Sequence, residues 1–235
     1  MSTTNDGHET TDMKTTYLAG VEEAGRGPVI GPMVMVIAAV PLSKESQLRG
    51  MGVKDSKLLT PNQREAIFEK LQGNVVYKVK VLSPAEIDAA VTSEETNLNW
   101  LEANISAGLI NQLAGEIALQ KVILDCPSTN IKAYTAYVKE RVQHAIPLLA
   151  EHKADVNYPI VSAASILAKV LRDREIEKLK KIVVEDFGSG YPSDPRTVEF
   201  LKKHHKTYAD AGIFRKSWST YQNLTKPQQK RLGEY

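Results

Sequence analysis

The sequence has little of what marks a secreted or membrane-bound protein. Cys126 is the single cysteine among 235 residues, so no internal disulfide can form, and this fits a reducing compartment. Residues 1–14 are polar and contain no apolar signal stretch, so we expect a disordered tail there. The longest apolar run, 28–42, is short and interrupted by proline and glycine. We therefore expect a cytoplasmic protein, or a nuclear one in a eukaryote, with no membrane contact.

Charge is plentiful but unevenly placed. The formal net charge is only +2, yet residues 202–235 contain eight lysines or arginines and two acidic residues. The remainder of the chain is therefore slightly acidic. A basic end on an acidic body indicates a polyanionic partner such as nucleic acid, although a solvated basic tail gives the same pattern.

Hydrophobic patterns predict an α/β domain with a mixed sheet. Thr60 with Gln63, and Ser83 with Glu86, form capping boxes that each precede a helix starting at a proline. Strands are predicted at 16–24, 32–40, 74–83, 121–125 and, weakly, within 147–155. Helices are predicted at 61–72, 84–91, 97–119 with a break at Gly108, 131–143 and 162–182. An antiparallel opening is thus followed by alternating strands and helices, with a helical, basic appendage after about residue 186.

Acidic residues follow several predicted strands. Glu22 and Glu23 end the first strand, Asp125 ends "KVILD", and Asp155 follows the weak strand. Any one of them alone is explained by a loop cap or an arginine partner, because burying an unpaired carboxylate is costly. Four converging carboxylates instead indicate bound divalent cations, and oxygen-only ligands suit Mg²⁺ or Mn²⁺ rather than zinc. The chain offers no convincing Ser/His/Asp or Cys/His set.

Several long motifs carry a family resemblance. The chain resembles type 2 ribonuclease H, and more closely the archaeal single-chain enzyme and the eukaryotic catalytic subunit, over about residues 16–220. The motifs are "GVEEAGRGPVIGPMV", "VKDSKLLT", "VILDCPS", "KADVNYPIVSAASILAKVLRD" and "GSGYPSDPRT". Type 3 relatives differ at Arg26 and carry an additional N-terminal domain. The resemblance implies a ribonuclease H-like, five-stranded mixed sheet flanked by helices at 15–185, and a helical, basic substrate-binding segment at 186–235.

The resemblance also implies a reaction. Glu22, Glu23, Asp125 and Asp155 would hold two divalent cations, Mg²⁺ or Mn²⁺, about 4 Å apart. Water activated there would attack a phosphodiester of RNA paired with DNA, or of a single ribonucleotide embedded in duplex DNA. The products would end in 3′-hydroxyl and 5′-phosphate groups, which places the chain in DNA replication and repair.

Other motif residues are expected to contact the substrate. Gly25 and Gly27 leave the backbone bare beside Arg26, so that the loop can approach a ribose 2′-hydroxyl, although a plain glycine hairpin has the same glycines. Tyr191 resembles the family's tyrosine that packs on the deoxyribose after the ribonucleotide; a packed loop anchor is the alternative. Further substrate contacts are implied for Lys54, Ser56, Lys57 and Arg172, and an exposed polar loop explains the first three equally well.

One residue departs from the family pattern. The family has Asp-Glu where this chain has Glu22-Glu23, so its first metal ligand is one methylene longer here. A displacement of about 1 Å in such a site can cost roughly 100-fold in rate. An alternative function is therefore a catalytically weakened relative that binds RNA/DNA hybrids. A second alternative is a subunit of a larger assembly.

The end of the chain suggests one further partner. Gln229, Leu232 and Tyr235 have a spacing that resembles a sliding-clamp-binding peptide, although a second aromatic residue is missing and a frayed basic end explains the same residues. Apart from nucleic acid and this clamp, we expect the chain to act as a monomer.

Overall fold

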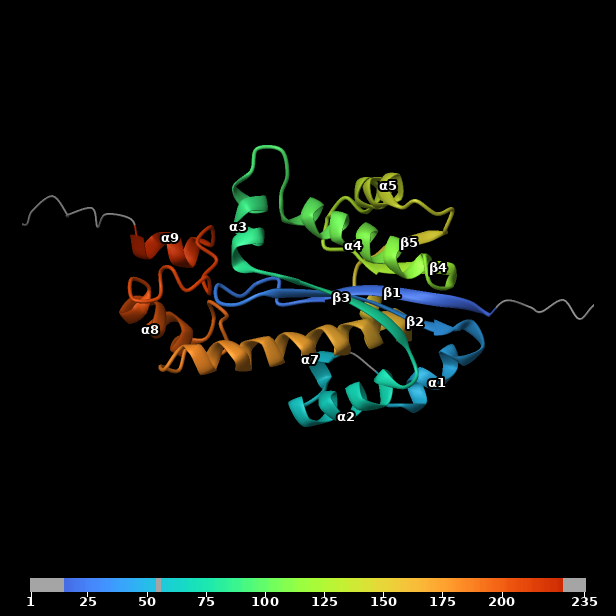
Figure 1. Cartoon of the computed structure of the whole chain (residues 1–235), viewed down its shortest axis with the longest axis horizontal. Coiled ribbons are helices and arrows are strands. Elements are labelled where there is room, and N and C mark those ends of the chain that lie inside the picture. Colours follow the sequence, from blue (N-terminus) through green and yellow to red (C-terminus); the bar gives the residue numbers. More distant parts are fainter. Residues whose placement is uncertain (1–14, 54–55, 226–235) are drawn as a thin grey trace, which may run out of the picture.

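A mixed five-stranded sheet forms the centre of the molecule (Figure 1). The computed structural model describes residues 15–53 and 56–225. In the order β3-β2-β1-β4-β5, β3, β2 and β1 pair antiparallel, and β4 and β5 continue in parallel. The strands are β1 Thr16–Ala24, β2 Met33–Pro41, β3 Val76–Leu82, β4 Ala118–Asp125 and β5 Leu148–Glu151. The predicted α/β fold, with an antiparallel opening followed by parallel units, is confirmed.

Helices cover both faces of this sheet (Figure 1). One face packs against α1 Glu45–Gly50, α2 Pro61–Gln72 and α7 Pro159–Ile182. The other face packs against α3 Pro84–Thr92, α4 Leu98–Ala114 and α5 Ile131–Arg141. The short helix α6 Ala154–Asn157 precedes α7, and two 3₁₀ turns lie at Leu42–Lys44 and Ser56–Leu58. Beyond one end of the sheet lie α8 Pro195–His204 and α9 Ser219–Thr225.

The apolar run of β2 is explained by burial on both faces. Val34 and Val36 contribute to the core under α7, whereas Met35 and Ile37 contribute to the core under α4. A strand covered on both sides needs no polar alternation, so its sequence is continuously hydrophobic. This central position holds the neighbouring β1, and the acidic residues at its end, in a rigid frame.

Gly20 determines how closely α7 packs on β1. A Cβ atom at this position would lie 2.7 Å from the backbone nitrogen of Val161 and 2.8 Å from the carbonyl carbon of Ile160. Those two residues belong to the first turn of α7. The absence of a side chain therefore lets the start of this helix rest directly on the strand.

Local signals predicted helix starts better than helix lengths. Both capping boxes are present, with Thr60 opening α2 and Ser83 opening α3. The helix predicted at 97–119 is wrong at its end, because α4 stops at Ala114 and β4 begins at Ala118. The predicted break at Gly108 is also wrong: α4 is continuous there, and a Cβ on Gly108 would meet nothing within 4 Å.

The segment after α7 shares a core with the β1–β2 hairpin. Phe187, Phe200 and Phe214 pack in one cluster with Val29 and Ile30. A backbone bridge also pairs Ile30 with Phe214. The C-terminal segment is therefore fastened to the loop that follows the two glutamates.

Candidate active site

Three of the four predicted carboxylates line one hollow. β1 and β4 are parallel neighbours, with Val21 opposite Leu124, so their carboxyl ends meet at the same edge of the sheet. Glu22 and Glu23 from β1 and Asp125 from β4 consequently border a hollow of about 310 Å³. The structure thus brings these three side chains together, as expected from their positions at strand ends.

Asp155 lies next to this group but does not line the hollow. Its side chain is buried, with 3% of the residue exposed, in α6. The preceding residue, Ala154, donates its N–H to Asp125 Oδ1 at 2.7 Å, and the Ser162 hydroxyl donates to the Asp155 carbonyl oxygen. A left-handed residue, Lys153, turns the chain from β5 into this helix. The residue that precedes Asp155 in the chain is therefore hydrogen-bonded to Asp125.

The paired glutamates sit in an environment that disfavours their charge. Burial raises the pKa of Glu22 well above its usual value, and the negative Glu23 and Asp125 raise it further. Burial likewise raises the pKa of Glu23. The Glu22 carboxylate accepts a hydrogen bond from the Glu23 backbone N–H. In the described part of the chain, no group of three or more His, Cys, Asp or Glu side chains is arranged to hold a metal ion.

The oxygen donors nevertheless fit a hard divalent cation. The hollow is bordered by carboxylates alone among strong metal ligands, with no histidine or cysteine. Burial is the main cause of the raised pKa values of Glu22 and Glu23, and the nearby negative charge of Asp125 adds to it. The donor types of Glu22, Glu23 and Asp125 are therefore compatible with a hard divalent cation.

The Gly-Arg-Gly turn packs against residues from the other end of the chain. Gly25 has a φ of 84°, and a Cβ there would lie 2.9 Å from Arg172 Nε. Gly27 faces the ring of Tyr191, which a Cβ would approach to 3.6 Å. Arg172 in turn donates to the Ser189 carbonyl oxygen at 3.2 Å. The structure therefore brings together the predicted residues Gly25, Gly27, Arg172 and Tyr191.

Arg26 is held by two residues that the sequence did not suggest. Its Nε donates to Glu102 Oε1 at 2.8 Å, and its Nη2 donates to Asn99 Oδ1 at 2.7 Å. Both acceptors lie on α4. Glu102 is fully buried, and the signal that identifies it in the sequence is that it is the single charged residue of α4.

Arg215 is a second residue that sequence analysis missed. It is fully buried and donates hydrogen bonds to three carbonyl oxygens: Gly25 at 2.6 Å, Arg26 at 2.8 Å and Gly31 at 3.0 Å. Trp218 Nε1 donates to the carbonyl oxygen of the remaining turn residue, Gly27, at 3.1 Å. The signal in the sequence is an arginine enclosed by aromatic residues in "IFRKSW".

Hydroxyl and basic side chains line the same hollow as the carboxylates. Ser56 Oγ lies 3.1 Å from Ser165 Oγ, and Lys169 and Arg64 line the same hollow. Arg64 donates to the Leu59 carbonyl oxygen at 2.7 Å and so fastens the loop that carries Ser56. Of the predicted loop contacts, Lys54 and the Lys57 side chain lie outside what the structure describes.

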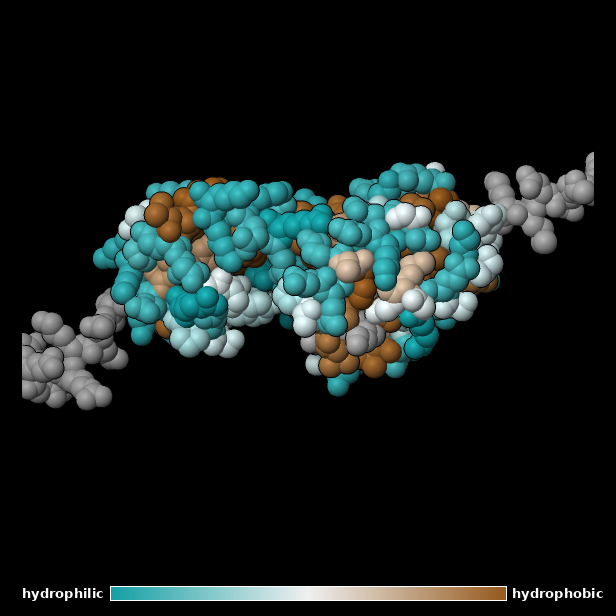
Figure 2. All heavy atoms as spheres, turned by 90° about the horizontal axis from the view of Figure 1, so that it is seen from below, coloured by the Kyte–Doolittle hydropathy of each residue, from teal (hydrophilic) through white to brown (hydrophobic). Residues whose placement is uncertain are grey.

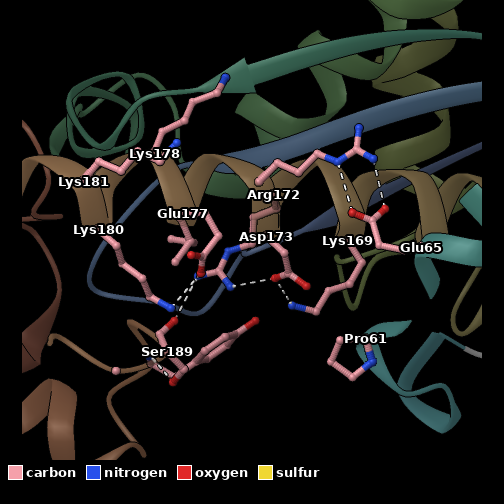
Figure 3. Close-up of a pocket in the computed structure, with 14 residues that line it drawn as sticks. Pro61, Glu65, Lys169, Arg172, Asp173, Glu177, Lys178, Lys180, Lys181 and Ser189 are labelled. Carbon is pink, nitrogen blue, oxygen red and sulfur yellow. Dashed lines mark hydrogen bonds and ion pairs between the residues drawn. The ribbon is translucent and has the colours of Figure 1, made fainter. Parts of the chain in front are cut away.

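A second hollow, of about 630 Å³, continues from the first along α7. Lys169 and Tyr191 border both hollows. Six basic and three acidic side chains line the second hollow, and Figure 3 shows Lys169 and Asp173 within it, 2.6 Å apart. Figure 2 shows the face beneath α7 and α2 as largely hydrophilic, with a recess between its two ends.

Comparison with known proteins identifies one family. A family model described as "Ribonuclease HII" matches residues 19–221, which include the carboxylates, the Gly-Arg-Gly turn, Tyr191 and Arg215. The chain belongs to the ribonuclease HII family. Ribonuclease HII of Pyrococcus horikoshii is 46% identical over 88% of this chain and 92% of that protein.

Solved structures of the family agree. The crystal structure of the ribonuclease H2 from Pyrococcus horikoshii OT3 matches with a TM-score of 0.80 and 46% identity, over 88% of this chain and 96% of that one. The structure of the PCNA:RNase HII complex from Archaeoglobus fulgidus matches with a TM-score of 0.78 and 37% identity, over 90% and 98%. The predicted ribonuclease H-like architecture is confirmed.

Membership of ribonuclease HII makes the chain an endonuclease of the ribonuclease H type, a hydrolase of phosphodiester bonds. The alternative of a catalytically weakened relative gains no support from these comparisons. In the described residues, no helix combines the length and apolar character needed to cross a bilayer.

Proposed function

We propose that this chain cleaves the RNA strand of RNA/DNA hybrids and single ribonucleotides embedded in duplex DNA, leaving 3′-hydroxyl and 5′-phosphate ends. The observation that carries the proposal is the adjacency of a bare-backbone turn, Gly25 to Gly27, and the carboxylates Glu22, Glu23 and Asp125 around one hollow. A ribose 2′-hydroxyl is the local mark that separates RNA from DNA, and it both donates and accepts hydrogen bonds. A turn that contacts it places the neighbouring phosphodiester beside the carboxylates.

We propose that four carboxylates hold two divalent cations, Mg²⁺ or Mn²⁺. Glu22, Glu23 and Asp125 supply the hollow's acidic edge, and Asp155 joins them through its proximity to Asp125. When bound, the cations supply an activated water and stabilise the leaving oxygen. The chain's own residues orient the substrate: Arg26 and the turn at the ribose, and Lys169, Ser56 and the neighbouring basic groups at the phosphates.

We propose that Tyr191 checks for the RNA-to-DNA junction, and its position beside the turn supports this role. Its ring faces Gly27 and lies 5.3 Å from the Arg172 guanidinium carbon, measured from the ring centroid. A deoxyribose placed on this ring follows the nucleotide that the turn contacts. We also propose that the second hollow along α7 receives the strand that leaves the site, because Tyr191 and Lys169 border both hollows.

The decisive experiment is cleavage of a DNA duplex that contains one ribonucleotide, in Mg²⁺ and in Mn²⁺. We expect a single cut next to the ribonucleotide and none in the all-DNA duplex of the same sequence. Asp125→Asn is the matched control: asparagine keeps an Oδ1 acceptor for Ala154 N–H but loses the charge, so cleavage should fall at least 100-fold while the fold persists. Cleavage of the all-DNA duplex, or near-normal activity of the variant, would overturn the assignment.

We also propose that two parts of the chain have different roles. We propose a catalytic part at 15–185 and a substrate-binding segment at 186–235; the tail predicted at 1–14 lies outside the described residues. The contacts that Tyr191 and Arg215 make with the Gly-Arg-Gly turn support this division. Ribonucleotides embedded in DNA arise during replication, so we place the activity in the cytoplasm, or in the nucleus of a eukaryote.

We further propose that a sliding clamp binds the C-terminal residues Gln229, Leu232 and Tyr235, which lie outside the described residues. A ribonuclease HII from Archaeoglobus fulgidus has been solved in complex with PCNA. Calorimetry of the full chain against its cognate clamp should show binding that a chain ending at Lys226 lacks. Equal binding by both chains, or by neither, would exclude this segment as the ligand. Without the clamp, we expect a monomer in size-exclusion chromatography.

A further inference from the structure

Glu102 is an unexpected residue in the interior of α4. It is fully buried, and its neighbours Ala103 and Ala107 on the same helix are buried as well. Burial raises the pKa of Glu102 to about 8, the negative Glu23 adds to this increase, and Arg26 opposes it. A buried carboxyl is costly to fold, so its presence beside the turn requires an explanation.

Its single strong contact is the arginine of the Gly-Arg-Gly turn. Arg26 Nε donates to Glu102 Oε1 at 2.8 Å, and Asn99, one helical turn earlier on α4, accepts from Nη2 at 2.7 Å. Two acceptors on one helix face thus fix one edge of the planar guanidinium. The Arg26 side chain remains 39% exposed, whereas that of Glu102 is 1% exposed.

The remaining edge of Arg26 is available to the substrate. Arg26 lines the hollow together with Glu23. Among the described residues, its Nη1 group has no hydrogen-bond partner, while its backbone carbonyl is held separately by Arg215. The backbone of the turn and the side chain of its arginine are therefore positioned by different parts of the chain.

We propose that Glu102 is a positioning residue for substrate recognition: it holds Arg26 so that the free edge of the guanidinium faces the phosphate and ribose in the hollow. Glu102 itself does not touch the substrate. A pre-oriented guanidinium loses less conformational freedom on binding than a solvated one, and so it contributes more to affinity. The inference rests on the proposed function only in taking Arg26 as a substrate contact.

A double-mutant cycle between Glu102 and Arg26 tests this dependence. Glu102→Ala should raise KM for the single-ribonucleotide duplex about 10-fold and change kcat less than about 3-fold. In the Arg26→Ala background, the same substitution should add less than about 2-fold, because the group that it positions is gone. A further 10-fold loss in that background would overturn the proposal, and so would a fall in kcat with KM unchanged.

A second readout does not depend on cleavage. With EDTA present, fluorescence anisotropy should show about 10-fold weaker binding of the same duplex by Glu102→Ala. Ser106→Ala is the matched control, because Ser106 is buried one turn further along α4, whereas the Arg26 side chain donates its hydrogen bonds to Glu102 and Asn99. Its affinity should equal that of the wild type. Unchanged affinity of Glu102→Ala would contradict the proposal.

The same experiments include a control for loss of the folded structure. Each variant is assayed below its own melting temperature, since Arg26→Ala removes the ion-pair partner of the buried Glu102. If Glu102→Ala does not fold, Glu102→Gln replaces it in the cycle, and its effect must likewise vanish in the Arg26→Ala background. Failure of the proposed function would appear separately, as a wild-type protein that does not cleave the ribonucleotide duplex at all.

Discussion

Arg215 donates a hydrogen bond of 2.6 Å to the carbonyl oxygen of Gly25, 190 residues earlier in the chain. The same guanidinium binds two further carbonyls, and Trp218 binds a fourth. These four hydrogen bonds fasten the backbone of the turn, and of the loop that follows it, to the C-terminal segment. Burial lowers the pKa of Arg215 to about 10, so it stays charged at neutral pH.

Removal of the Arg215 side chain should lower the stability of the protein. Arg215→Ala leaves three buried carbonyls without a donor, so we expect the free energy of unfolding to fall by about 3 kcal/mol or more. Chemical denaturation measures the loss. Arg196→Ala, on exposed α8 and paired only with Asp186 and Asp194, is the control and should change it by less than about 1 kcal/mol. Similar losses in both variants would contradict the role of Arg215.

Glu22→Asp restores the residue usual in the family. In the structure, the Glu22 carboxylate accepts from the neighbouring Glu23 N–H, a fold-back that the longer side chain permits. We expect the aspartate variant to cleave as fast as the wild type or up to about 10-fold faster, since its carboxylate is held nearer the strand. Initial rates across a Mg²⁺ titration measure this. A large loss would show that the site is built around glutamate.

Stability should fall as the pH rises through neutrality in metal-free protein. The folded-state pKa values of Glu22, Glu23 and Glu102 are raised, so the folded protein holds protons that the unfolded chain has lost. The stability that these three carboxyls contribute is therefore fully present below their unfolded pKa of about 4.3 and is lost as the pH rises through their folded pKa, about 8 for Glu102.

Thermal melts in EDTA between pH 6 and pH 9 measure this decline. The carboxyls with lowered pKa values, among them Glu86 and Asp194, are ionised in both states above pH 6 and do not contribute to the slope. Glu102→Gln should flatten the profile, and Mg²⁺ should raise the melting temperature most at the alkaline end. A flat or rising wild-type profile would be inconsistent with the charge arrangement.

Tyr191→Ala should impair cleavage of a single embedded ribonucleotide more than cleavage of a long hybrid. The ring supplies a surface for one deoxyribose, whereas a hybrid is held by many backbone contacts. We expect about a 10-fold larger loss in kcat/KM on the first substrate. Tyr191→Phe keeps the ring and serves as the control. Equal losses on both substrates would make Tyr191 a structural anchor only.

Short-range patterns in the sequence predicted much of the fold. The capping boxes at Thr60 and Ser83 act over three residues, and the strand carrying Glu22 was predicted with its observed bounds. The meeting of Glu23 with Asp125 followed from two strands ending at the same edge of a sheet. Such features depend on local propensity and sheet geometry, which a sequence displays directly.

The residues that hold the Gly-Arg-Gly turn in place could not be predicted from short-range patterns. Glu102 reaches Arg26 across 76 residues and Arg215 reaches it across 189, and no local pattern links them. Their sequence signals are a single charged residue in α4 and an arginine among aromatic residues, and these indicate burial but not the partner. Asp155 was placed after a strand, and its position in a short helix depends on the left-handed Lys153.

The missing side chain of Gly20 sets a limit on how this site can vary. Even alanine at this position would push the first turn of α7 off the strand, since the Cβ would overlap the backbone of Ile160 and Val161. Asp155 lies just ahead of that turn, and Glu22 lies two residues beyond Gly20. The close approach of α7 to β1 at Gly20 thus limits how far Asp155 can move from Glu22, so variation of this acidic group is confined to the carboxylate side chains themselves.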